Sequence, residues 1–197
     1  MSRDKTGARI LDAALALIKK RGDARVTMAD IAAAAKISRQ AVYLHFPDRA
    51  GLMVALVRHA DERRNLADEI QKISGAPSGT AALREMAALQ ARLNPGIWAA
   101  ARAVDAVRRL DPAAERSWQD RLEHRLAGAG EIISRLRAEK ALRPNLDPGA
   151  AADLLWSITS LRMWEDLVLL RGWTAAQYEE RITELLLISL TRTQPPA

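Results

Sequence analysis

The chain has 197 residues, 49% hydrophobic and 27% charged with a net charge of +6, a balance typical of a globular protein with a sizeable core. It contains no cysteine and only three scattered histidines, which excludes disulfides and thiol chemistry and leaves no metal or cofactor to predict. No apolar stretch approaches the roughly 18 residues of a membrane helix, and the start lacks the apolar core of a secretory signal, so we expect a cytoplasmic protein.

Helices are predicted throughout, because apolar residues recur at helical spacing while Pro and Gly lie between the segments. Thr27, Ser38 and Thr174 are expected N-caps, since a hydroxyl there can accept a free backbone N–H. The predicted fold class is therefore all-α, with nine helices. In chain order the clearly delimited ones are 4–20, 28–34, 39–46, 49–73, 80–93, 148–170 and 175–192, and two more lie between the breaks at 94–96, 111–112 and 143–145.

Basic residues concentrate at the start of the chain. Residues 1–49 contain ten Lys and Arg and five Asp, so they carry a net +5 of the total +6. A basic head on a nearly neutral body is typical of a protein that binds nucleic acid, although a solvated basic surface without a partner has the same composition.

Residues 27–46 have the spacing of a helix-turn-helix, in which two short helices are joined by a tight turn. Ile31, Val42 and Phe46 can form the small core between the helices. The opposite face of the second helix carries Arg39 and Gln40, whose side chains match the hydrogen-bonding edges of guanine and adenine. The alternative is a helical hairpin with incidental polar residues on its solvent face.

A longer string of residues resembles the TetR family of bacterial transcriptional regulators. The resemblance covers roughly residues 5–56 and rests on residues 27–32, 37–46 and 48–53, with a Tyr-x-His-Phe element at its centre. Beyond residue 60 it is only architectural. It implies a two-domain protein: a three-helix DNA-binding domain over 1–48, a helical ligand-binding and dimerisation domain over 49–193, and a disordered tail over 194–197.

The resemblance also implies roles for individual residues. Thr27, Tyr43, His45 and Arg49 match phosphate-contacting positions, with Arg49 in place of the usual Lys, although a partly buried structural role for His45 stays open. Base-reading positions are matched by Arg39 and Gln40, with Ala41 and Leu44 as contacts for thymine methyl groups. The complete predicted DNA-binding set is Thr27, Lys36, Ser38, Arg39, Gln40, Ala41, Tyr43, Leu44, His45 and Arg49.

Two positions depart from the family pattern. Lys36 occupies the turn position that usually holds Gly, where a left-handed conformation costs another residue about 1 kcal/mol. The substitution places a cation beside the DNA backbone. Ala29 stands where some members carry a base-reading polar residue, so the operator sequence of a relative cannot be transferred.

The last two predicted helices, 148–170 and 175–192, are apolar around most of their circumference. A helix of this kind must be buried on several sides. We expect a twofold four-helix bundle with a second copy of the chain, and a central helix of a monomer is the alternative. The predicted interface residues are Leu155, Ile158, Leu169, Ile182, Leu186 and Leu190.

All five tryptophans follow residue 90, where they are surrounded by many small alanines. Large rings beside small residues can form the wall of a cavity, and sparse polar residues on apolar faces can anchor a ligand. An unpaired Asp105 would favour a cationic or hydrogen-bond-donating ligand, whereas pairing with Arg102 or Arg108 would make it structural. Each Trp can equally be core. The predicted pocket residues are Met86, Gln90, Trp98, Asp105, Trp118, Trp156 and Trp164.

Together these features predict a ligand-responsive transcriptional regulator, most simply a repressor. It would bind a palindromic operator in double-stranded DNA as a homodimer and would be released by a small-molecule effector. A ligand-independent DNA-binding or architectural protein is the alternative. No nucleophile elbow, metalloprotease motif, phosphate-binding loop or dinucleotide fingerprint is present, so no enzyme activity is expected.

Overall fold

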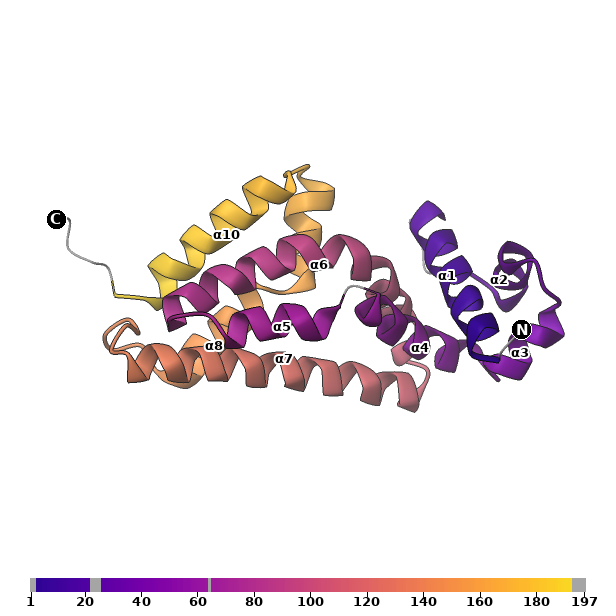
Figure 1. Cartoon of the computed structure of the whole chain (residues 1–197), viewed down its shortest axis with the longest axis horizontal. Helices are drawn as coiled ribbons and strands as arrows, with labels where there is room; N and C mark the ends of the chain where they lie inside the picture. The colour runs from indigo at the N-terminus through magenta and orange to yellow at the C-terminus, as the bar shows by residue number, and fades with distance from the viewer. Residues whose placement is uncertain (1–2, 22–25, 64, 193–197) are drawn as a thin grey trace. The chain divides into compact units, whose positions relative to one another are not determined.

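The computed structural model describes residues 3–21, 26–63 and 65–192 (Figure 1). Within these residues it contains nine α-helices of seven residues or more and no strand, which confirms the predicted all-α class. The predicted tail at 194–197 lies outside the described residues. The helices are α1 (Arg3–Arg21), α2 (Met28–Ala35), α3 (Arg39–His45), α4 (Arg49–Glu62), α5 (Leu66–Ser74), α6 (Gly79–Arg108), α7 (Pro112–Ala138), α8 (Pro148–Ile158), the short α9 (Leu161–Trp164) with the π-helix η1 (Glu165–Leu170), and α10 (Ala175–Leu190).

One compact unit comprises Met1–Asn65 and Gly96–Arg121. In its N-terminal part α1 packs against both α2 and α4, and α2 packs against α3 (Figure 1). An ion pair also joins α1 to α4, since the His59 ring lies 2.7 Å from the Asp12 carboxylate, which Arg63 contacts as well. The fully buried side chains between these helices include Ile10, Ile18, Ile31, Leu52, Met53 and Leu56.

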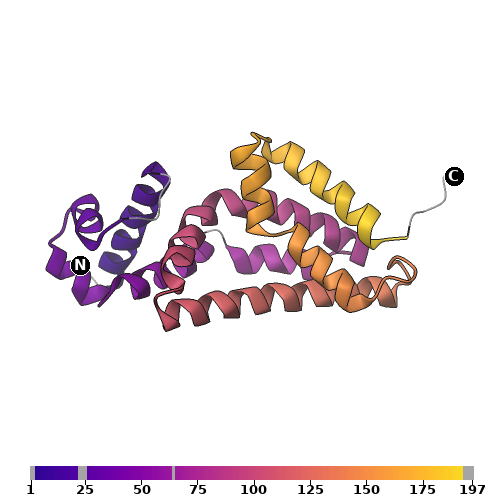
Figure 2. The same ribbon diagram turned by 180° about the vertical axis from the view of Figure 1, so that it is seen from behind.

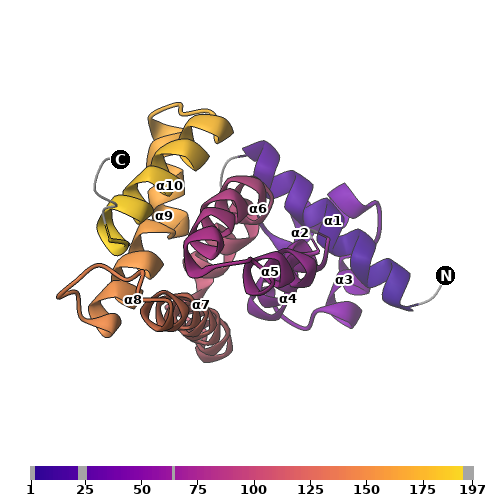
Figure 3. The ribbon, with the colours of Figure 1, turned by 60° about the vertical axis from the view of Figure 1, so that its left-hand side comes forward.

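The other compact unit comprises Leu66–Pro95 and Leu122–Ala197. Its α5 lies between α6 and α7 (Figures 1 and 3), tied to α6 by a 2.7 Å ion pair between Glu69 and Arg92. α10 packs against α8 and η1 (Figure 2). The predicted boundary at residue 48, between a DNA-binding domain and a ligand-binding domain, remains a prediction. The core of this unit includes Leu83, Ile133, Leu136, Leu155, Tyr178 and Ile182.

The three expected N-caps are confirmed. Thr27, Ser38 and Thr174 each have an extended backbone, and each side-chain oxygen accepts the N–H of the residue three positions later. Thr27 and Thr174 complete reciprocal capping boxes with Asp30 and Gln177. These short-range hydrogen bonds explain why the helix starts could be located from the sequence.

Two predicted helices are divided in the structure. The segment 49–73 is split into α4 and α5, and Asn65 between them has a φ of 50°. Asn tolerates this left-handed conformation better than most residues, so it can end a helix without Gly. The segment 148–170 is split at Thr159, after which Ser160 caps α9 by accepting the N–H of Met163.

A predicted break, in contrast, is absent. α6 continues through residues 94–96 with Pro95 inside the helix. A proline there removes one backbone hydrogen bond, at a cost of about 3 kcal/mol. The residues on either side, Leu93, Asn94 and Ile97, are all buried. Burial of the whole helix face therefore outweighs the local effect of the proline.

Candidate DNA-binding surface

The start of α2 is fixed by a network around Asp30. The Thr27 hydroxyl accepts the Asp30 N–H at 3.1 Å, and the Asp30 carboxylate accepts the Thr27 N–H at 2.9 Å. Arg21 donates to the same carboxylate at 3.1 Å. The hydrogen bonds from Arg21 and then from Thr27 hold the pKa of Asp30 well below its ordinary value. Thr27, which is exposed, is thus held at a helix N-terminus, where backbone N–H groups favour an anion.

The turn between α2 and α3 is left-handed at Lys36, with φ 55° and ψ 47°. This confirms the conformation expected at that position. The N–H of Ile37 donates to the Ala32 carbonyl at 3.1 Å and closes the end of α2. The Lys36 side chain is exposed. Lys36 is therefore held in a strained left-handed conformation, and its positive charge lies next to the start of α3.

α3 has a sharply two-sided character. Val42 is fully buried against the domain core. Ser38, Arg39 and Gln40 are exposed on the other side, and Leu44 exposes 69% of its surface. Such an exposed leucine on a polar face suits contact with an apolar base substituent such as a thymine methyl group. The structure therefore places the predicted base-reading residues on one accessible face, with Ala41 half-buried at its edge.

Arg39 and Tyr43 form a pair on this face. The Arg39 guanidinium donates to the Tyr43 hydroxyl at 3.3 Å, and its Cζ lies 5.5 Å from the centre of the tyrosine ring. The pair is one turn apart on α3, so the contact needs no other element. Arg39 must leave Tyr43, at least in part, if it is to form two parallel hydrogen bonds with a guanine.

Two further predicted DNA contacts are half-buried. Arg49 donates through Nε to the Val26 carbonyl at 3.1 Å, which holds its side chain beside the start of α2. His45 lies against α1, because a Cβ atom at Gly7 would stand 3.6 Å from its Nδ1. This packing agrees with the structural alternative for His45. Its role at a phosphate remains a prediction.

The predicted ligand residues divide between the two compact units. Trp98, Asp105 and Trp118 belong to the unit that contains α1 to α4, whereas the other four belong to the second unit. Asp105 is half-buried and accepts from Arg108 at 2.7 Å, and Arg108 also contacts Glu115 and lies over the Trp118 ring. The structure therefore favours the ion-paired interpretation of Asp105, which removes the reason to expect a cationic ligand.

In the second unit Gln90 is buried as expected, and its Nε2 contacts the Met86 sulfur at 3.5 Å. Two buried polar residues of this unit were not predicted, namely Asn94 and Tyr178, and each has a polar atom without a hydrogen-bond partner. A signal existed for both. Asn94 follows Gln90 by one helical turn. Tyr178 is followed at four-residue spacing by Ile182 and Leu186, so it lies on the same apolar face of the last helix.

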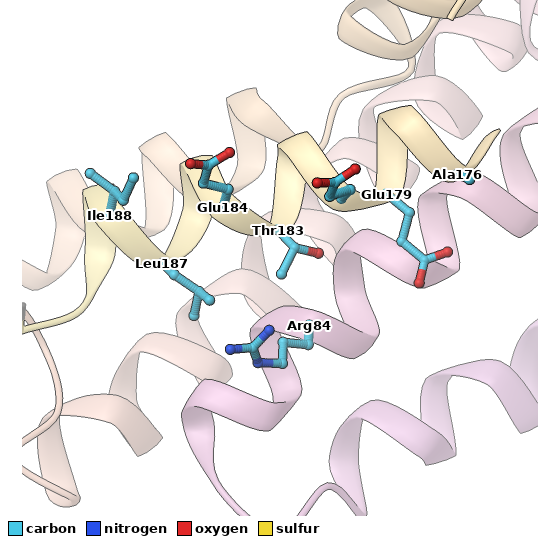
Figure 4. A pocket seen from close by; sticks show the side chains of 8 residues that line it. Arg84, Ala176, Glu179, Thr183, Glu184, Leu187 and Ile188 are labelled. Atoms are coloured by element: carbon cyan, nitrogen blue, oxygen red, sulfur yellow. The ribbon is translucent and has the colours of Figure 1, made fainter. Parts of the chain in front are cut away.

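An open groove of about 680 Å³ runs between α6 and α10 (Figure 4). It contains none of the predicted ligand residues. A shallow groove with charged walls differs from the enclosed, mainly apolar sites that small molecules usually occupy. Its lining residues are Arg84, Ala176, Glu179, Glu180, Thr183, Glu184, Leu187 and Ile188.

The six predicted dimer residues differ in exposure, and their place in an interface remains a prediction. Of the six, Leu155, Ile158, Ile182, Leu186 and Leu190 are buried inside the protomer, because α8 and α10 pack against each other and the core. Leu169 is the exposed member of the set. The apolar side chains that α8 and α10 leave exposed are Leu154, Leu185 and Ile188, with relative exposures of 41%, 40% and 65%.

The described residues contain no candidate for two other kinds of feature. In that part of the chain no three His, Asp or Glu side chains come together in a way that could hold a metal ion. Nor is any helix there both long and apolar enough to cross a membrane.

Comparison with known proteins identifies relatives of the N-terminal region and of the fold. Residues 10–56 match the family model "Bacterial regulatory proteins, tetR family". The HTH-type transcriptional repressor LfrR of Mycolicibacterium smegmatis is 36% identical over 94 residues, and the HTH-type transcriptional regulator TtgR of Pseudomonas putida is 47% identical over 53 residues. The chain thus spans 48% and 25% of the lengths of these two relatives.

The similarity in fold extends over the whole chain. One similar structure is a transcriptional regulator from Saccharomonospora viridis in complex with choline. It superposes with a TM-score of 0.81 at 18% sequence identity, and the alignment includes 97% of this chain and 100% of that one. The two-domain helical architecture is therefore shared well beyond the region of sequence similarity. The similar proteins are transcriptional regulators, in agreement with the prediction that the chain is no enzyme.

Proposed function

Because residues 10–56 match the model of the tetR family of bacterial regulatory proteins, we propose that this chain belongs to that family and is a ligand-responsive transcriptional repressor. It binds a palindromic operator as a homodimer and is released when a small molecule binds to its C-terminal domain. LfrR, its relative over 94 residues, is a repressor, and this supports repression over activation. Its place of action would be the bacterial cytoplasm, where the operator is.

The observation that carries the proposal is the exposed face of α3. Arg39, Gln40 and Leu44 project from a helix whose first turn is capped by Ser38 and whose other side is buried through Val42. This is the arrangement by which a recognition helix presents its N-terminal residues to the major groove. Thr27, Lys36, Tyr43, His45 and Arg49 would hold the phosphates on either side.

Dimerisation follows from the geometry of DNA. Two recognition helices can read successive major grooves on one side of the duplex when they stand about 34–36 Å apart. We assign the contact between copies to the exposed apolar residues Leu154, Leu185 and Ile188 of α8 and α10. An effector would release DNA if it bound better to a dimer with another spacing, and DNA would then weaken effector binding to the same degree.

The test is operator selection. The full-length protein is mixed with a pool of random double-stranded DNA, bound sequences are enriched, and affinity is measured by fluorescence anisotropy at several salt concentrations. We expect an inverted repeat with half-sites about one helical turn apart, and binding that weakens steeply with salt. Enrichment of no sequence, or of one without symmetry, contradicts the proposal.

A second measurement separates the proposed regulator from a ligand-independent DNA-binding protein. The complex with the selected operator is titrated with a small-molecule library, and the anisotropy is followed. A compound that dissociates the complex and binds the free protein more tightly than the DNA-bound protein identifies a ligand-responsive regulator. Equal affinity for both forms would show that the ligand does not control DNA binding.

A further inference from the structure

Arg125 on α7 holds the point where α8 ends. Its Nη2 donates to the carbonyl of Trp156 at 3.0 Å and to the carbonyl of Thr159 at 3.1 Å. These carbonyls need an outside donor because the helix stops at Ile158. The guanidinium carbon also lies 5.4 Å from the centre of the Trp156 ring. A positive charge is thereby fixed beside that ring, inside the second compact unit.

Two buried hydrogen-bonding groups on α8 and α10, which pack against each other, have no partner. They are Nε1 of Trp156 and the hydroxyl of Tyr178. Tyr178 on α10 is fully buried. Burial raises the pKa of its hydroxyl, and the positive charge of Arg125 opposes this rise, so the hydroxyl lies within the field of the guanidinium. Buried polar groups are nearly always paired, so two unpartnered ones near a single cation indicate a site for a hydrogen-bond acceptor.

Two further buried side chains of this unit carry amide N–H donors. Asn94 has an unpartnered Nδ2, and Gln90 has only the Met86 sulfur near its Nε2. Among the buried side chains that the structure describes there is no Asp or Glu. A cationic ligand would therefore find no buried counter-charge here, whereas an anion would find both hydrogen-bond donors and Arg125.

We propose that Trp156, Tyr178 and Arg125 form the polar end of a ligand site that takes a carboxylate. The carboxylate oxygens accept the Trp156 Nε1–H and the Tyr178 O–H, and the guanidinium of Arg125 balances their charge. Carboxylate binding can be measured in the absence of DNA and does not depend on the proposed function. Only the role of this ligand as an effector rests on that function. The inference replaces the cationic ligand that an unpaired Asp105 would have favoured.

The test uses the full-length protein without DNA. Its melting temperature is measured with millimolar acetate, butyrate, octanoate and benzoate, and with the alcohol and the amine of the same carbon skeleton as each. We expect at least one carboxylate to raise the melting temperature by several degrees more than its alcohol and amine. The proposal is overturned if no carboxylate does so, or if an amine stabilises the protein as much as its carboxylate.

Two variants that keep an aromatic ring test the location of the site. Trp156→Phe and Tyr178→Phe each remove one hydrogen-bonding group and keep an aromatic ring, and each should raise the Kd of the stabilising carboxylate about tenfold. Without a carboxylate the melting temperature of Tyr178→Phe should be unchanged or slightly raised, because a buried unpartnered hydroxyl is lost. That of Trp156→Phe should fall, because the smaller ring leaves a cavity, so its Kd is compared at a temperature where it is fully folded. A clear fall in the melting temperature of Tyr178→Phe would mean that the hydroxyl has a structural partner and would refute the assignment.

The control variant is Tyr43→Phe, which loses the same hydroxyl on the exposed face of α3 and should bind the carboxylate normally. Arg125 is left unchanged because it holds the end of α8. The two proposals fail separately. A protein that binds a carboxylate but no DNA contradicts the proposed function alone, whereas one that binds an operator but no carboxylate contradicts this inference alone.

Discussion

In the pair α2 and α3 and in the pair α8 and α10 the two helices pack against each other, but the sequences of the two pairs convey different amounts of information. In α3 a buried Val42 stands opposite the charged Arg39 and the polar Gln40, so the sequence itself separates an inner from an outer face. From Leu185 to Leu190 of α10, in contrast, every residue but Ser189 is apolar, so inner and outer positions look alike in the sequence. A helical pattern identifies a face only when the other face is polar.

The largest expected effect distinguishes the two faces of α10. Leu186→Glu places a charge at a fully buried position and should lower the free energy of unfolding by more than about 4 kcal/mol. Ile188→Glu, at a position 65% exposed, should change that energy by less than about 0.5 kcal/mol but dissociate the proposed dimer. Urea denaturation and sedimentation measure the two quantities. A stable Leu186→Glu protein would show that the assigned core is incorrect.

The next effect concerns the outer face of α3. Arg39→Ala should reduce discrimination at one base pair of each half-site by about 1–3 kcal/mol. Tyr43→Phe should instead weaken binding to all sequences by a similar factor, since it removes a phosphate contact. Competition binding with single-base operator variants measures both. Arg58→Ala is the control for loss of charge, because Arg58 is an exposed residue of α4. Unchanged specificity in Arg39→Ala would remove this residue from base recognition.

A smaller effect compares two left-handed lysines. Lys36 and Lys140 have φ values of 55° and 56°, so replacing either by Gly should relieve strain and stabilise the protein by up to about 1 kcal/mol. Lys36→Gly alone should also weaken DNA binding and lower the slope of its salt dependence by about one ion. Thermal denaturation and salt titrations of operator binding measure these changes. An equal loss of DNA binding in Lys140→Gly would contradict a local role for Lys36.

The smallest effect concerns the link between α1 and α4. Burial of the Asp12 carboxyl acts to raise its pKa, but hydrogen bonds from His59 and Arg63 outweigh burial, so the pKa lies below the ordinary 3.8. A lowered pKa means that ionised Asp12 stabilises the folded state above pH 3.8 and that this contribution is lost as the pH falls through the folded-state value.

Asp12→Asn should therefore cost no more than about 1 kcal/mol at neutral pH, since the side chain is 43% exposed and screened by solvent. The difference from the unaltered protein should shrink when urea denaturation is repeated at progressively lower pH. Asp153→Asn, at an exposed position on α8, serves as the control. A difference that grows on acidification would mean that the ion pair is not the stabilising form.

Features set by local hydrogen bonds could be predicted from the sequence. The N-caps at Thr27, Ser38 and Thr174, and the left-handed Lys36, depend on residues within a few positions of each other. The polar face of α3 belongs to the same class. For this reason the exposed face of α3 could be predicted from the sequence.

Features set by distant packing could not be predicted. Nothing near Pro95 in the sequence shows that Leu93, Asn94 and Ile97 are buried in a continuous α6. Nothing near Thr159 shows that Arg125, 34 residues earlier, will bind the free carbonyls at the end of α8. The partner of Asp105 required a choice between two arginines on the same helix. The proposed ligand site depends on such long-range contacts, which only the structure shows.

Pro95 has one more consequence, for the melting of α6. A proline lacks an N–H, so the Ala91 carbonyl, four residues earlier in this helix, loses its usual donor. Helix–coil cooperativity depends on an unbroken series of such hydrogen bonds. Fraying that begins at Arg108 therefore meets a weak point at residue 95 and need not spread into Gly79–Asn94. Although α6 is drawn as a single helix, amide hydrogen exchange should resolve it into two segments with their own protection.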